Sequence, residues 1–78
     1  RPAATAKAAS EAAPRELLTA RELDVLRLLP EGLSYAEIGE RLGITARTVD
    51  AHLRAVYAKL HVRSRHQASA YARRHGLA

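Results

Sequence analysis

Residues 34–54 constrain the fold more than any other part of the chain, because they predict two short helices joined at a fixed angle. Gly43 follows the first helical stretch, where the chain needs a left-handed terminating residue that only Gly adopts cheaply. Thr45 then offers a side-chain oxygen that can cap the next helix, and Ile44 and Val49 have the spacing to pack together around that cap. The sequence therefore predicts a helix, a tight corner and a second helix.

Gly39 lies inside the first of these two helices. A Gly in a helix interior costs roughly 1 kcal/mol relative to Ala. Its presence is best explained if another helix crosses closely at this point, because the absence of a side chain lets two backbones approach. We therefore expect tight packing at Gly39.

Ser or Thr residues that can cap a helix occur at four places in the chain. Three of them are followed three residues later by Glu or Gln, which is the pattern of a reciprocal capping box. Thr45, followed by Thr48, is a weaker fourth start. Four helix starts in so short a chain leave no room for a sheet. The three boxes are Thr19 with Glu22, Ser34 with Glu37, and Ser64 with Gln67.

The predicted fold class is therefore all-α, a four-helix helix-turn-helix domain in which each apolar stripe faces a common core. Pro30 should end or bend the first helix, because Pro lacks a backbone donor and clashes with the preceding turn. The fourth helix offers only Ala68, Tyr71 and Ala72, so it either packs thinly or uses Tyr71 against a partner. The helices are expected at about 20–29, 35–42, 46–60 and 65–75, with a core of Val25, Leu26, Leu29, Ile38, Leu42, Val49, Leu53, Val56, Tyr57 and Leu60.

The N-terminal region differs in composition from the rest. Residues 1–14 contain seven Ala and two Pro and show no apolar periodicity, which is typical of a tether. We therefore predict an interdomain linker at 1–16 and a folded domain at 17–78. The chain starts at Arg and has no apolar run long enough for a signal peptide or a membrane span, so it resembles a piece of a cytoplasmic protein.

Positive charge is concentrated in the second half of the chain. Residues 43–78 hold 7 Lys or Arg against the single acid Asp50, whereas residues 1–42 hold 6 against 7 acids. A surface of this kind favours nucleic acid or an anionic membrane as a partner. A solvated basic face without any partner is the alternative, and charge alone does not decide between them.

The outward face of the predicted helix 46–60 carries Asp50, Ala51 and Arg54 close to its start. The major groove of B-DNA admits one α-helix whose first turns meet base edges. Arg54 can donate two hydrogen bonds to guanine O6 and N7 unless it is simply a solvated charge, and Ala51 can contact a thymine methyl. Asp50 can accept from a cytosine amino group, or it can pair with Arg54 four residues on, and both interpretations stay open. We expect phosphate contacts from Arg47, Thr48 and His52 and from the helix N-termini at Ser34 and Thr45.

Catalysis and metal binding find little support in the sequence. Ser34, Asp50 and His52 have the residue types of a catalytic triad, but they lie on short helices without an oxyanion loop or a phosphate-binding Gly-rich loop. The chain has no Cys, and the His residues after position 60 lack the helical spacing that places two imidazoles on one metal. We therefore expect no enzyme activity, no cofactor, no metal and no small-molecule ligand.

Three ordered strings resemble the LuxR-type helix-turn-helix domain, which is also called the FixJ or NarL type. They begin Leu-Thr-Ala-Arg-Glu-Leu at 18, Gly-Leu-Ser-Tyr-Ala-Glu-Ile at 32 and Val-Tyr-Ala-Lys-Leu at 56, and the resemblance covers residues 17–78. It implies the C-terminal effector domain of a bacterial transcriptional regulator, with the third helix in the major groove of double-stranded DNA. It also implies a homodimer through the fourth helix, with RNA polymerase as a further partner. The matching positions are Asp50, Ala51 and Arg54 facing bases, Arg47, Thr48, His52 and Lys59 near the DNA backbone, and Gln67, Ala70, Tyr71 and Arg74 in the dimer contact.

Four positions depart from the family pattern: Asp50 and His61, and also Pro30 and Gly39, which stand where Ala is common. Many members have Lys where this chain has Asp50, which alters the expected sequence preference. His61 stands where Gly is usual after the recognition helix, so a non-Gly residue must tolerate the turn there.

Two other functions stay open at this point. The promoter-binding region of a sigma factor looks similar through residues 42–53, but the capped helix at Ser64 argues against it. A helical protein-interaction module with a basic face would bind an acidic partner and no DNA. A steep fall of DNA affinity with increasing salt would indicate DNA binding and argue against the protein-interaction module.

Overall fold

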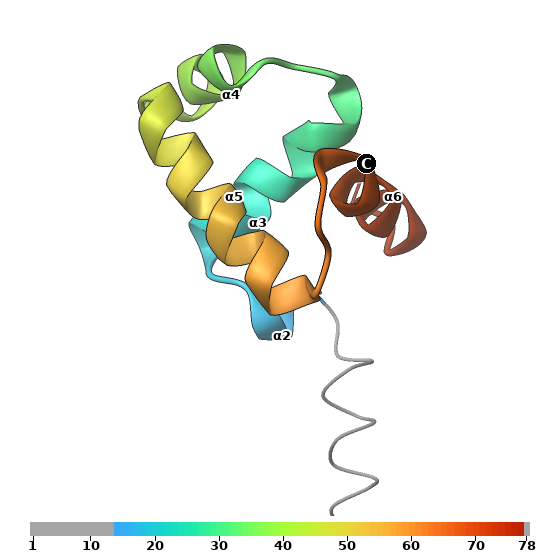
Figure 1. Cartoon of the computed structure of the whole chain (residues 1–78). Coiled ribbons are helices and arrows are strands. Elements are labelled where there is room, and N and C mark those ends of the chain that lie inside the picture. The colour runs from blue at the N-terminus through green and yellow to red at the C-terminus, as the bar shows by residue number, and fades with distance from the viewer. Residues whose placement is uncertain (1–13, 78) are drawn as a thin grey trace, which may run out of the picture.

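The computed structural model describes residues 14–77, and every regular element in that range is helical (Figure 1). The four predicted helices are confirmed, each within one residue of its expected bounds. The elements in order are α2 (Pro14–Leu17), α3 (Ala20–Leu28), the 3-10 helix η1 (Leu29–Glu31), α4 (Tyr35–Leu42), α5 (Ala46–Leu60) and α6 (Arg65–Arg74).

The short helix α2 was not predicted by the sequence analysis. It packs against α3, and the predicted boundary at residue 16 falls inside it. The rest of the predicted linker, residues 1–13, lies outside the described residues.

The helix α5 occupies the centre of the fold. It packs against both α4 and α3, whereas α6 lies to the side and packs mainly against η1 and α3 (Figure 1). The apolar stripes meet where these helices cross, and the largest fully buried side chains come from α3, η1, α4 and α5. The buried apolar residues are Leu18, Val25, Leu26, Leu29, Ile38, Val49, Leu53, Val56, Leu60, Ala68 and Ala72.

The helix starts follow the capping chemistry predicted from the sequence. Thr19 and Ser34 each form a complete box, in which the cap oxygen accepts from the backbone of the third helical residue and a Glu carboxylate accepts from the cap backbone. Thr45 caps α5, since its oxygen accepts from the backbone N–H of Thr48 at 3.2 Å. These bonds satisfy backbone donors that the first helical turn leaves unpaired.

The box predicted at Ser64 is only half formed. The Ser64 oxygen accepts from the Gln67 backbone N–H at 3.2 Å, but the Gln67 side chain accepts from the Arg63 backbone at 2.7 Å instead of from Ser64. Ser64 has φ −148°, against −69° and −71° at the two complete boxes. This more extended backbone turns the Ser64 N–H away, so the expectation of a reciprocal box was wrong here.

The corner between α4 and α5 has the predicted geometry. Gly43 ends α4 in the left-handed region at φ 72°, and its N–H donates to the Gly39 carbonyl. Gly39 is buried, and a Cβ on it would lie 3.3 Å from the Thr45 carbonyl carbon and closer still to the Ile44 carbonyl oxygen. The predicted tight packing at Gly39 is confirmed, but the backbone that approaches it is the corner at Ile44 and Thr45 and not the body of another helix.

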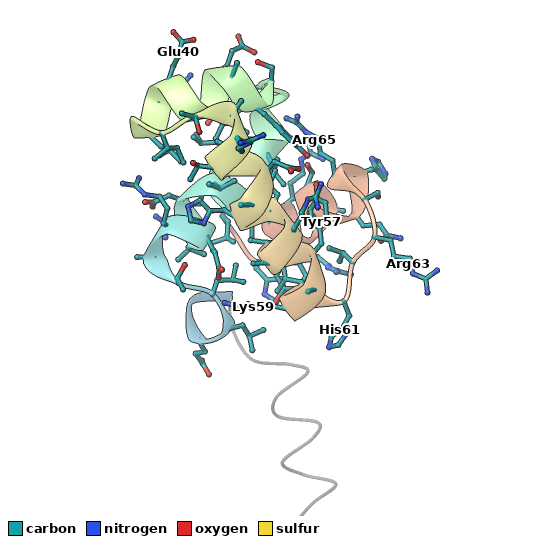
Figure 2. All side chains as sticks on the ribbon, turned by 60° about the vertical axis from the view of Figure 1, so that its left-hand side comes forward. Glu40, Tyr57, Lys59, His61, Arg63 and Arg65 are labelled. Atoms are coloured by element: carbon teal, nitrogen blue, oxygen red, sulfur yellow. The ribbon has the colours of Figure 1, made fainter. Side chains whose placement is uncertain are left out.

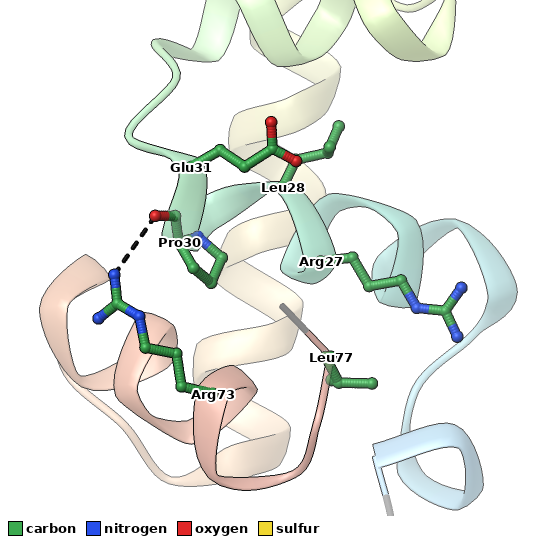
Figure 3. A pocket seen from close by; sticks show the side chains of 6 residues that line it. All are labelled: Arg27, Leu28, Pro30, Glu31, Arg73 and Leu77. Carbon is green, nitrogen blue, oxygen red and sulfur yellow. Dashed lines mark hydrogen bonds between the residues drawn. The ribbon is translucent and has the colours of Figure 1, made fainter.

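The first predicted helix changes character at Pro30, as expected for a residue that cannot donate a backbone hydrogen bond. α3 gives way to η1, and Gly32 ends η1. Two Arg side chains on α6 bind carbonyl oxygens in and beside this turn. Arg65 donates to Leu29 and Leu33, and Arg73 donates to Pro30 at 3.3 Å (Figure 3). These bonds attach α6, which has little apolar surface, to the rest of the fold.

His61 ends α5 at φ 57° and ψ 39°. It is the one non-Gly residue in the described part of the chain with a positive φ. The left-handed region disfavours side chains with a Cβ, so His61 carries local strain that Gly would not. The expectation that a non-Gly residue tolerates this turn is confirmed.

Candidate nucleic-acid interface

α5 presents one apolar and one polar face, and the structure orients both as the sequence predicts. Val49 and Leu53 are fully buried under α5, whereas the Arg54 side chain is 80% exposed. Arg47 and Ala51 are also exposed. The outer surface of α5 thus combines a cationic side chain with a small residue that lets another molecule approach the backbone.

Asp50 and Arg54, one turn apart on α5, form an ion pair. The Arg54 Nε lies 3.1 Å from the Asp50 Oδ2, and the Asp50 side chain is 42% exposed. Of the two interpretations that the sequence left open for Asp50, the intrahelical pair is the one present in this structure.

The N-terminus of α5 exposes backbone donors beside the predicted phosphate-contacting residues. Thr48 is half-buried, and its hydroxyl lies 3.0 Å from that of Thr45. The N–H groups of Ala46 and Arg47 precede the first intrahelical bond, and they have no hydrogen-bond partner among residues 14–77. Backbone donors at a helix N-terminus attract anions such as phosphate.

The two remaining residues predicted near phosphates, Ser34 and His52, lie on different helices. His52 is half-buried on α5. Ser34 is exposed at the start of α4, where its oxygen accepts from the Glu37 N–H at 3.1 Å. The hydrogen bond from the Ser34 backbone is the main reason why the pKa of Glu37 is lowered, and the Ser34 side chain and the charge of Arg41 also lower it, whereas burial acts in the opposite direction. The Glu37 carboxylate therefore stays ionised at the N-terminus of α4.

Lys59, another predicted backbone contact, has a partner inside the protein. Its ammonium donates to the Glu22 Oε1 over 2.7 Å, on the side of α5 that faces α3 (Figure 2). The Glu22 side chain is only 8% exposed, and the same oxygen accepts from the Thr19 backbone at 2.9 Å. Burial alone would raise the pKa of Glu22, but the bonds from Lys59 and Thr19 lower it below its ordinary value. Glu22 and Lys59 therefore tie the start of α3 to the end of α5.

Tyr57 lies on α5 on the side toward Arg65 (Figure 2). Its hydroxyl is buried and has no hydrogen-bond partner among the described residues. Burial, together with the nearby phenol of Tyr35, raises the pKa of Tyr57 to about 12. Tyr57 therefore stays neutral in the physiological range and belongs to the packing between α4 and α5.

The residues predicted for the dimer contact lie on one side of α6 and are largely open to solvent. Gln67, Ala70 and Arg74 are exposed, and Tyr71 is half-buried. The Tyr71 ring stacks on His75 with centroids 4.2 Å apart, and the Arg74 guanidinium lies 5.9 Å from its centroid. Burial raises the pKa of Tyr71, although the charge of Arg74 opposes this.

Three surface hollows lined by residues of the described range lie away from the outer face of α5. One of about 530 Å³ lies between α3, η1 and the C-terminal segment, and it is lined by Arg27, Leu28, Pro30, Glu31, Arg73 and Leu77 (Figure 3). Among the described residues, no group of three His, Cys, Asp or Glu side chains is arranged to hold a metal. Within residues 14–77, no helix has both the length and the apolar character to cross a membrane.

The geometry of α4, the corner and α5 agrees with comparisons to known proteins. Residues 16–72 match the family described as bacterial regulatory proteins, luxR family. The chain belongs to the luxR family. It is 48% identical over 66 residues to the transcriptional regulatory protein LiaR of Bacillus subtilis (strain 168), a stretch covering 85% of this chain and 31% of that protein. It is 42% identical over 62 residues to the response regulator protein VraR of Staphylococcus aureus (strain NCTC 8325), covering 80% and 30%.

This luxR-family domain thus spans about a third of the length of these relatives. A further relative, the putative HTH-type transcriptional regulator Rv0890c of Mycobacterium tuberculosis (strain ATCC 25618 / H37Rv), is 51% identical over 59 residues, which are 76% of this chain and 7% of that protein. The family match and the fold together support a helix-turn-helix DNA-binding domain, which was the resemblance stated from the sequence.

The sequence did not reveal two features of the luxR-family domain that shape this surface. One is the burial of Glu22 and its pairing with Lys59, and the other is the attachment of α6 through Arg65. The Glu22 capping box was visible as a local motif, but nothing local indicated a partner on α5. Arg65 carried no signal beyond its position at the start of α6.

Proposed function

We propose that this luxR-family domain binds double-stranded DNA sequence-specifically, with α5 in the major groove. The observation that carries the proposal is the orientation of α5, which buries Val49 and Leu53 and leaves Arg54 80% exposed. A helix that is anchored beneath and cationic above can enter the groove with its first turns against base edges.

The roles of individual residues follow from their positions. Arg54 donates to a guanine, and Ala51 contacts a base edge such as a thymine methyl. Arg47, Thr48 and His52, together with the helix N-termini at Ser34 and Thr45, contact phosphates. Lys59 reaches the DNA backbone only with the donors that its bond to Glu22 leaves unused.

We propose further that two copies associate through Gln67, Ala70, Tyr71 and Arg74 on α6 when DNA is bound. Tyr71 is half-buried and Arg74 is exposed, and Tyr and Arg are enriched at interfaces between proteins. As the effector part of a response regulator in the bacterial cytoplasm, the domain would act on transcription and would present its remaining surface to RNA polymerase. Sedimentation velocity on a duplex with two half-sites tests the dimer, and Tyr71→Ala should reduce the stoichiometry from two chains to one.

The experiment that tests DNA binding is a salt titration of affinity on duplexes selected from a random library. Several phosphate contacts predict a linear fall of log affinity with log salt. Arg54→Ala should cost about 1–3 kcal/mol and relax the preference at one base pair, whereas Arg47→Ala should weaken all sequences alike. Arg27→Ala, which removes an exposed Arg from α3, is the matched control and should leave affinity unchanged.

Two outcomes would contradict these proposals. If no duplex binds at low salt while an acidic protein does, the domain is a protein-interaction module. If Arg54→Ala and Arg47→Ala cause equal losses on selected and random duplexes, Arg54 does not contact bases.

A further inference from the structure

The ion pair with Asp50 on the outer face of α5 determines which edge of the Arg54 guanidinium is open to another molecule. A guanidinium has five N–H donors in a planar fork. The Asp50 Oδ2 lies 3.1 Å from Nε, so the ion pair engages the guanidinium at Nε and leaves the two parallel N–H groups of the outer Nη1 and Nη2 edge for another acceptor. Since 80% of the Arg54 side chain is exposed, this outer edge is accessible to a molecule lying against α5.

Guanine presents two acceptors, O6 and N7, side by side in the major groove, and a planar pair of donors matches them. A long side chain that moves freely before binding loses that freedom when it is ordered on a base. We propose that Asp50 is a positioning residue, which holds Arg54 by Nε so that the Nη1 and Nη2 edge is already aligned for a guanine. This inference rests on the proposed function, because it concerns the same face of α5.

The charge of Asp50 supports a role in specificity. Asp50 is the single acid in residues 43–78, and it lies on the face that would approach phosphates. A carboxylate there opposes binding to any DNA, whatever its sequence. By partly neutralising Arg54, Asp50 also weakens the attraction of that guanidinium to phosphates in general. Asp50 therefore lowers non-specific affinity while it raises the preference of Arg54 for one base.

A direct contact from Asp50 to a cytosine amino group would leave a different signature. The carboxylate would then prefer cytosine at its own base pair, and that preference would persist without Arg54. A positioning residue has no preference of its own, so its effect must vanish when Arg54 is removed. The two cases are separated by a double-mutant cycle.

The experiment uses the 78-residue chain and a duplex selected with it from a random library. Fluorescence anisotropy gives the Kd of the selected duplex, of its variants at each base pair, and of a random duplex. Five proteins are compared: wild type, Asp50→Ala, Asp50→Asn, Arg54→Ala and the double variant Asp50→Ala/Arg54→Ala. Thermal unfolding by circular dichroism confirms that each is folded, which is expected because both side chains lie at the surface.

Arg54→Ala identifies the base pair that Arg54 contacts, because it abolishes base discrimination there. At this base pair the wild type should prefer guanine by about 5- to 150-fold, the range expected for one bidentate pair. Asp50→Ala should reduce that preference by about 2- to 13-fold, which corresponds to the ordering of one long side chain. The same variant should bind the random duplex more tightly than the wild type. Asp50→Asn, whose amide oxygen can accept a hydrogen bond from Nε, should keep more of the guanine preference than Asp50→Ala. The double variant should show the same base preference at this position as Arg54→Ala alone.

An unchanged guanine preference in Asp50→Ala would overturn the inference and leave the proposed DNA binding intact. If Asp50→Ala instead removes a preference for cytosine at another base pair, and does so in the Arg54→Ala background as well, Asp50 contacts a base itself. That result would also overturn the inference. Failure of the wild type to bind any duplex at low salt would overturn the proposed function together with this inference.

Discussion

Replacing Lys59 by Met removes the cation that faces the most deeply buried carboxylate of the described chain. Met keeps the length and most of the apolar stem of Lys, so the packing along α5 changes little. Glu22, only 8% exposed, loses the 2.7 Å hydrogen bond from Lys59 and keeps the bond from the Thr19 backbone. The change thus isolates the contribution of one charged hydrogen bond between α3 and α5.

The expected loss of stability follows from the burial of the two partners. A hydrogen bond to a charged group contributes about 1.5–3 kcal/mol, whereas an exposed ion pair contributes about 0.2–1 kcal/mol. Glu22 is buried, but Lys59 is 39% exposed and so partly screened by solvent. We therefore expect Lys59→Met to lower the free energy of unfolding by about 1–2 kcal/mol, which corresponds to about 4–16 °C in Tm for a domain of this size.

Urea and thermal unfolding followed by circular dichroism at pH 7 measure this loss. Arg63→Met is the matched control, because Arg63 is an exposed cation on the segment after α5, and its effect should stay within about 0.5 kcal/mol. Adding Glu22→Gln to Lys59→Met should cost less than Glu22→Gln alone, since the unpaired buried charge is then gone. If Lys59→Met has the stability of Arg63→Met, the ion pair does not stabilise the fold.

Three further predictions test other parts of the structure. The lowered pKa of Glu22 means that its contribution is present above pH 4.5 and is lost as pH falls through the folded-state pKa, so Glu22→Gln should flatten the acid limb of a stability profile. His61→Gly should raise the free energy of unfolding by about 0.5–1 kcal/mol in urea titrations, since relief of left-handed strain outweighs the added freedom of the unfolded chain; an unchanged midpoint would contradict that strain. Leu53→Ala, at a fully buried site, should cost about 2–5 kcal/mol in the same titrations, and a cost below about 0.5 kcal/mol, as at surface sites, would place Leu53 outside the core.

The sequence predicted those parts of the fold that depend on neighbouring residues. The caps at Thr19, Ser34 and Thr45 and the left-handed ends at Gly43 and His61 are each decided within a few positions. Local chemistry was therefore sufficient to place the helices and the corner. The partner of the Ser64 box was not predictable in this way, because it depends on a backbone torsion that the residue types leave open.

Contacts between distant segments were not predicted. Glu22 and Lys59 are 37 positions apart, and Arg65 is 36 positions from Leu29, so no periodicity or spacing connects them. α2 was missed because its four residues, Pro14–Leu17, are too few to show a helical periodicity and follow directly on the stretch interpreted as a tether. The outer face of α5 was predicted, since helical periodicity separates it from the core, but the presence of the Asp50–Arg54 ion pair could be seen only in the structure.

The central claim is that the outer face of α5 meets DNA, and amide chemical shifts during titration with a selected duplex test it most directly. We predict the largest changes at residues 45–54 and at the start of α4 near Ser34, with small changes around the hollow between α3, η1 and the C-terminal segment. Changes concentrated in that hollow, with the amides of α5 unaffected, would contradict the account.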